Sequence, residues 1–390
     1  MRGTYEIVYP PEAKARLESL CELTCDTLID PRYFYRLAHI CQQIQGIVII
    51  NNNLNANHGT IKLIEFQKNL KYFEWVDDFT EFTEDYDFFD WEKLEDTYTE
   101  NFDILKKHAN TLIHFKINLH QFDYDYSTNY DYTFLQYTLL ELHNLKILEI
   151  DSPLFLNIDD FNEKLEMVTY RDLEIIEIDV IDIYQVTCII KNSLYLKELW
   201  IDNFHIEKDF FTDDFLNFIN TICDNCFLIE YLSIPVFPLL ENHFIEFERL
   251  LKKCQNLRSL NFKDACYEKR KALEFGDYLS NVLIREASTN LINIGIPYFD
   301  IEFSLETLEK FFEKWKGRPA VSLYFDNTYF YRKDNSYMKL FDKYKIEGSG
   351  LIKIFISCNG GYLVNRLCKL SEYCSARSKL PKPQIFNFRA

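Results

Sequence analysis

The chain has 390 residues, of which 47% are hydrophobic and 27% are charged, a composition that indicates a large folded protein and excludes a disordered one. Its formal net charge of −18 argues against nucleic acid as a partner, because nucleic-acid binding depends on Lys and Arg side chains that neutralise phosphates. No apolar run approaches the roughly 20 residues that cross a bilayer, so we expect no membrane partner either.

One short pattern, apolar-x-x-apolar-x-apolar, recurs eleven times along the chain. The last two anchors of each triplet are two residues apart, which is the period of a strand with one buried face. The triplets begin at Leu20, Ile44, Leu70, Leu112, Leu145, Leu173, Leu196, Ile229, Leu257, Leu291 and, more weakly, Ala320. The mean spacing is 30 residues, at the long edge of the leucine-rich-repeat range of about 20 to 29.

Stretches with helical spacing lie between the triplets. They are, in chain order, residues 31–43, 60–68, 91–109, 160–171, 212–225, 241–255, 272–287 and 304–316. In the last of these, Ser304 is a good N-cap and Gly317 a good stop signal. A strand–helix unit cannot bury its apolar face alone, so we expect the units to stack.

This alternation predicts an α/β fold, a leucine-rich-repeat solenoid with a curved parallel sheet on the concave side and helices on the convex side. We expect about eleven irregular repeats within residues 1–346. The competing fold is a doubly wound α/β domain, on which an unrecognised enzyme or small-ligand-binding protein could be built. The glycine-rich phosphate-binding turns of such domains are absent from the sequence.

Three repeats carry a cysteine three residues before the first anchor: Cys41, Cys226 and Cys254. This pattern resembles the cysteine-containing leucine-rich repeats of F-box proteins. Longer stretches, residues 63–75, 304–320 and 337–345, resemble a large fungal group of F-box and leucine-rich-repeat proteins.

The resemblance covers about residues 12–346 and implies the substrate-recognition part of a ubiquitin-ligase adaptor, with a protein substrate as its partner. No F-box segment is found before Pro11. Partnership with a Skp-type adaptor and a cullin scaffold is therefore expected only where an F-box lies upstream; otherwise the chain would be an F-box-less relative.

The charge balance changes near the C-terminus. From residue 349 to residue 390 there are seven Lys or Arg against one acidic residue, whereas residues 1–348 hold 36 against 60. We therefore expect residues 347–390 to form a basic tail, either of different origin from the rest or folded against the acidic body.

Classical catalytic and metal motifs are missing, so we predict no catalytic residue, no cofactor and no metal site. Cys223 and Cys226 have the spacing of half a zinc site, but a second pair would be needed, and buried free thiols are the simpler interpretation. Eleven cysteines without a leader or a glycosylation sequon favour a reducing compartment, the cytoplasm or the nucleus.

Two acidic features could bind a basic protein. Residues 74–103 contain thirteen Asp or Glu with interleaved aromatic residues, and form either a binding loop or a solvated insertion. Along three successive strands, the residues between and after the anchors should share the concave surface. We therefore predict one protein-binding patch, made of Glu149, Asp151, Glu177, Asp179, Glu198, Trp200 and Asp202.

Overall fold

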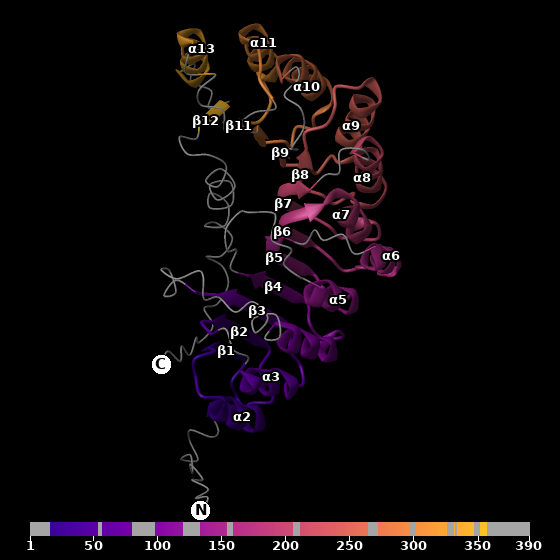
Figure 1. The fold of residues 1–390 in the computed structure, drawn as a ribbon. Helices are drawn as coiled ribbons and strands as arrows, with labels where there is room; N and C mark the ends of the chain where they lie inside the picture. Colours follow the sequence, from indigo (N-terminus) through magenta and orange to yellow (C-terminus); the bar gives the residue numbers. More distant parts are fainter. Residues whose placement is uncertain are drawn as a thin grey trace, which may run out of the picture. The chain divides into compact units, whose positions relative to one another are not determined.

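The computed structural model describes eleven stretches of the chain (Figure 1). These are residues 16–53, 57–79, 98–119, 133–153, 159–205, 211–263, 272–296, 301–325, 331, 334–346 and 352–356. The chain divides into two compact units, and the boundary between Lys164 and Leu165 falls within helix α6 (Asp159–Met167). Of the described residues, we call those up to residue 164 unit 1 and those from residue 165 unit 2.

Unit 1 contains a parallel sheet whose strands follow one another in chain order. The strands are β1 (Glu22–Asp26), β2 (Gly46–Asn51), β3 (Tyr72–Asp77), β4 (His114–Asn118) and β5 (Ile147–Pro153). The helices between them are α2 (Pro31–Ile40), α3 (His58–Glu65), the 3-10 helix η3 (Ile104–His108) and α5 (Thr133–Glu141).

Unit 2 repeats the arrangement, again with parallel strands in chain order. Its strands are β6 (Ile175–Asp182), β7 (Glu198–His205), β8 (Tyr231–Pro235), β9 (Ser259–Lys263), β10 (Asn293–Ile296), β11 (Val321–Phe325) and β12 (Ile352–Ile356). Its helices after α6 are α7 (Ile183–Ile190), α8 (Phe211–Asn225), α9 (Glu241–Lys253), α10 (Ala272–Glu286), α11 (Leu305–Trp315) and α13 (Asn335–Ile346).

The apolar triplets form the layer between the sheet and the helices. The predicted layer residues Leu148, Ile150, Ile176, Ile178, Leu199, Ile201, Leu232 and Ile234 are all buried. The weakest triplet needs a correction, because Ala320 is exposed and Val321, at the start of β11, is buried in its place. The pattern thus identified the buried face of the strands β1 to β11.

One backbone hydrogen-bond pattern recurs where the strands begin. In unit 1 the carbonyl oxygen of Cys21 accepts from the N–H groups of both Gln45 and Gly46, at 2.7 and 3.0 Å. The carbonyls of Gln45, Lys71 and Ile113 each accept two consecutive N–H groups of the next repeat in the same way, as do those of Glu174, Lys197, Glu230 and Arg258 in unit 2. This shared acceptor aligns β2 to β5 and β7 to β10 with the strands that precede them.

Helix α11 begins and ends as the sequence predicts. The Ser304 hydroxyl accepts from the N–H of Thr307 at 3.2 Å, and Gly317 has a φ of +87° just beyond the last turn. Helices α5 and α7 were not expected, and β12 lies within the range assigned to the basic tail.

In both units strand and helix alternate and the strands keep the order of the sequence, as in a solenoid. A doubly wound sheet would instead reverse its strand order at a switch point, and no reversal occurs among the strands that the structure describes. The α/β repeat fold is therefore confirmed. No helix among the described residues is long and apolar enough to cross a membrane.

Candidate functional site

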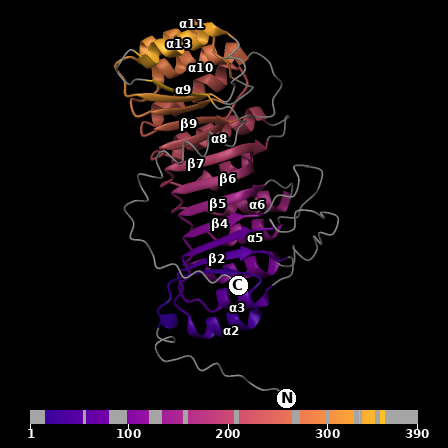
Figure 2. The same cartoon turned by 90° about the vertical axis from the view of Figure 1, so that its left-hand side faces the viewer.

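The helices of each unit lie on one face of its sheet, and the other face carries the residues between the anchors (Figures 1 and 2). We call this second face the open face. Its side chains are set by strand alternation: in β5, for example, Leu148 and Ile150 point into the buried layer, and Glu149 points away from it.

In unit 1 the open face carries a compact charged cluster around Lys116 of β4. Its ammonium lies 3.2 Å from a carboxylate oxygen of Glu74 in β3 and 3.4 Å from one of Glu149 in β5. The His114 Nε2 is 3.0 Å from the other Glu149 oxygen, and the Tyr72 hydroxyl donates to Glu74. The parallel register brings these groups together, because it pairs Glu74 with Lys116 and Lys116 with Glu149.

Glu149 and Lys116 stay ionised near neutral pH. Burial raises the pKa of Glu149, but hydrogen bonds from His114 and Lys116 outweigh burial and hold that pKa below its ordinary value. Burial acts on Lys116 in the opposite sense, and the charges of Glu149 and Glu74 keep its pKa above the usual range. Glu149 is therefore an ionised, internally paired carboxylate, while Asp151, two residues further along β5, is exposed.

The other five predicted site residues belong to β6 and β7 of unit 2. The register pairs Glu177 with Trp200, so both lie on the open face, and the Asp179 carboxylate accepts from the Asn203 amide at 3.3 Å. Glu149 and Asp151 belong to unit 1, so the seven residues fall into two groups, each defined within its own unit.

Trp200 was predicted to be part of the binding patch, and it is only 8% exposed. Its indole stacks on the ring of Tyr231 in β8, with ring centres 5.3 Å apart, and its Nε1–H donates to Glu198 at 2.9 Å. Tyr231, which is half-buried, is therefore the more accessible aromatic ring of the pair.

Asp202 has a partner that the sequence did not suggest. The Lys263 ammonium at the end of β9 lies 3.2 Å from an Asp202 carboxylate oxygen, although the two residues are 61 positions apart in sequence. Lys263 is largely buried, whereas Asp202 is partly exposed. One of the predicted carboxylates is thus already neutralised by a lysine of the same sheet.

Sequence reasoning also missed a row of small polar side chains beside this group. Ser233 of β8 and Ser259 and Asn261 of β9 point to the open face, between anchors that point to the helices. The Asn261 amide donates to the Ser259 hydroxyl at 3.3 Å, and the register pairs Ser233 with Asn261. Their positions could have been found by continuing the alternation used for β5 to β7 into the next two strands.

Cys223, Cys226 and Cys254 in unit 2 are buried thiols. Burial raises the pKa of Cys223 to about 11 and that of Cys254 to about 12, and it also raises that of Cys226. Thiolates are the form that binds metal, so these sites are unfavourable ligands near neutral pH. Among the residues the structure describes, no three His, Cys, Asp or Glu are arranged to hold a metal ion.

The acidic stretch 74–103 lies mostly outside the described residues, which stop at residue 79 and resume at residue 98. Of its described aromatic residues, Trp75, Phe79, Tyr98 and Phe102 are buried. Its proposed role as a binding loop therefore stays a prediction.

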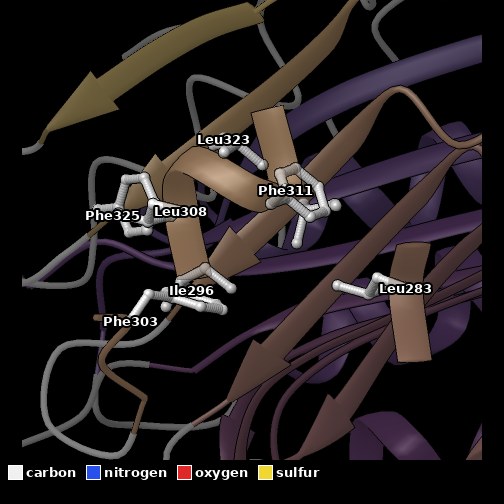
Figure 3. A pocket seen from close by; sticks show the side chains of 8 residues that line it. Leu283, Ile296, Phe303, Leu308, Phe311, Leu323 and Phe325 are labelled. Atoms are coloured by element: carbon white, nitrogen blue, oxygen red, sulfur yellow. The ribbon is translucent and has the colours of Figure 1, made fainter. Parts of the chain in front are cut away.

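A crevice in unit 2 lies between the sheet and helices α10 and α11 (Figure 3). Its free volume is only about 10 Å³, room for about one water molecule, and it is partly open to solvent. Its lining is entirely apolar and consists of Leu283, Ile294, Ile296, Phe303, Leu308, Phe311, Leu323 and Phe325. Without a polar group to orient a ligand, it is part of the hydrophobic layer rather than a binding site.

Comparison of the sequence with protein-family models and with curated proteins gives no match. The open faces of the two units therefore carry the functional argument.

Proposed function

We propose that the chain is a protein-interaction module that binds a basic segment of a partner protein on the open face of unit 2. The observation that carries the proposal is the grouping of Glu177, Asp179 and Glu198 beside the stacked rings of Trp200 and Tyr231. Carboxylates attract Lys or Arg side chains, and an aromatic face adds a cation–π contact.

The repeat architecture supports a binding role over a catalytic one, because stacked repeats present extended surfaces rather than a single deep site. The repeat cysteines and the resemblance to fungal F-box and leucine-rich-repeat proteins support a narrower proposal. In it, the chain is the substrate-recognition part of an F-box-type ubiquitin-ligase adaptor or an F-box-less relative of one. The basic segment would then belong to the protein substrate.

Charge reversal tests the binding face. The variant Glu177→Lys/Asp179→Lys should lose partner capture, and capture by the unchanged protein should weaken as salt rises, since exposed charges are screened within about 8 Å at physiological ionic strength. The thermal unfolding midpoint should stay the same or rise, because like charges on one face repel. Pull-down followed by mass spectrometry measures capture.

The matched control reverses two carboxylates on the helix side of unit 2, in the variant Asp213→Lys/Asp342→Lys. Both residues are exposed, on α8 and α13. Recovery of the same partners from the open-face variant as from this control would refute the proposal. Co-purification with a Skp-type adaptor tests the ubiquitin-ligase connection separately.

A further inference from the structure

The small polar side chains of the open face are buried where no described helix covers them. Ser233 and Ser259 are both 0% exposed and Asn261 is 4% exposed, yet the helices of unit 2 lie on the opposite face of the sheet (Figure 2). The Ser233 hydroxyl is buried and has no hydrogen-bond partner among the residues that the structure describes. A buried hydroxyl without a partner costs about 1 to 3 kcal/mol, so this face is suited to a segment that brings hydrogen-bonding groups.

The same face has an excess of negative charge. Its described side chains from β6 to β9 include the four carboxylates Glu177, Asp179, Glu198 and Asp202 and one cation, Lys263. Their formal sum is −3. A segment that lies here should therefore be basic.

Residues 357–390 have the matching chemistry. They contain six Lys or Arg and one acidic residue, Glu372. They follow directly after β12, which is the last strand of the sheet of unit 2.

The reach of this segment is sufficient. Its 34 residues span up to about 110 Å when extended, while six strand-to-strand steps separate β12 from β6, a distance of about 29 Å. Such a tether gives the segment an effective concentration in the millimolar range, so even weak binding would fill the face.

We propose that residues 357–390 are an internal ligand of the open face of unit 2, held by its carboxylates and its buried polar row. The segment would then compete with the basic partner. That competition rests on the proposed function; the docking itself does not.

The test uses the full chain and, as a probe, a labelled synthetic peptide of residues 357–390. The peptide should bind the unchanged protein weakly, because the tethered copy occupies the face. Neutralising the tethered copy with Arg366→Gln, Lys369→Gln, Arg377→Gln and Lys379→Gln should tighten peptide binding at least tenfold. Adding Glu177→Lys/Asp179→Lys to this neutralised chain should abolish that gain, whereas adding Asp213→Lys/Asp342→Lys should preserve it. Fluorescence anisotropy titrations measure all four affinities.

Equal affinity of the peptide for the unchanged and the neutralised chain would overturn the proposal, as would no binding to either. A gain that survives the open-face reversal would also overturn it, because the peptide would then bind elsewhere. The outcome is independent of any partner protein: a chain can bind its own tail and still fail to capture a basic partner, which would count against the proposed function alone.

Discussion

His108 is a buried histidine of η3 in unit 1. Its imidazole Nε2 lies 2.9 Å from the carbonyl oxygen of Ile64, so this nitrogen carries the proton and donates. Burial lowers the pKa of His108, and the hydrogen bond to Ile64 opposes this effect without cancelling it. The folded protein therefore holds the neutral imidazole.

This burial predicts a pH-dependent stability. The pKa of His108 is lower in the folded state than the ordinary value of about 6.5, so the unfolded chain binds the proton more readily. The contribution to stability should be complete above pH about 6.5 and should decrease as the pH falls below it. Urea titrations at pH 8 and pH 5.5 measure the change. The variant His108→Gln, which cannot titrate, should lose less stability over that interval, and an equal loss in both proteins would contradict the assignment.

Glu149 shows how much of the site the sequence could predict. The alternation of apolar anchors placed it correctly on the face away from the helices, but its pairing with His114 and Lys116 was not anticipated. Those residues are on β4, more than 30 positions earlier in the chain. Lys116 occupies the same place in its triplet as Glu149, so aligning the triplets as neighbours would have revealed the contact. The burial of Trp200 depends on the large ring of Tyr231 in the next strand. The residue pattern of β7 alone could not predict this contact.

Among the elements, α11 allows a test of whether its last turn needs a glycine with positive φ behind it. Gly317 has a φ of +87°, and a Cβ placed on it would meet no atom within 4 Å. A substitution there therefore changes the backbone preference and causes no collision. Gly317→Ala should lower the free energy of unfolding by about 1 kcal/mol.

Denaturant titration measures this loss, and Gly317→Asn is the matched comparison, because asparagine tolerates positive φ better than alanine. We expect the asparagine variant to lose less stability than the alanine variant. Equal stability of all three proteins would mean that positive φ is not required at this position.

Helix α7 shows why some elements were not predicted. Its sequence from Ile183 to Ile190 is rich in β-branched residues and follows directly on strand β6. Because β-branched residues favour strands, such a run predicts a strand. The side chain of Asp182 accepts from the N–H groups of Tyr184 and Gln185 and so begins the helix, while nearly every residue of the helix is buried. Burial in the tertiary structure thus outweighs the local strand propensity of α7. Helices α9 to α11 have clear amphipathic spacing, and their bounds were predicted within a few residues.

At the scale of the whole molecule, stability should depend on layers shared by neighbouring repeats. Leu199 is fully buried in β7, which pairs with β6 on one side and β8 on the other. Leu199→Ala should cost on the order of 2 to 5 kcal/mol, as expected for a large cavity in a packed layer. A denaturant titration measures the loss, and a change below about 0.5 kcal/mol would be incompatible with the position of Leu199 in this layer.

The loss should also be local. In repeat proteins each unit contacts its neighbours only, so hydrogen exchange in the variant should accelerate first in β6 to β8. Uniform acceleration through all the strands of unit 2 would instead indicate a single cooperative block.

The carbonyl that accepts two consecutive N–H groups has an evolutionary consequence for the strands β2 to β5 and β7 to β10, which begin in this way. Each of these strands receives its alignment from a carbonyl of the preceding repeat. Duplicating or deleting one complete strand–helix unit would therefore leave every remaining alignment intact, whereas gaining or losing a single residue inside a strand would turn its apolar anchors to the wrong face. Related chains should thus differ in length by whole repeats, or by insertions between strands, and the spacing inside the apolar triplet should stay constant.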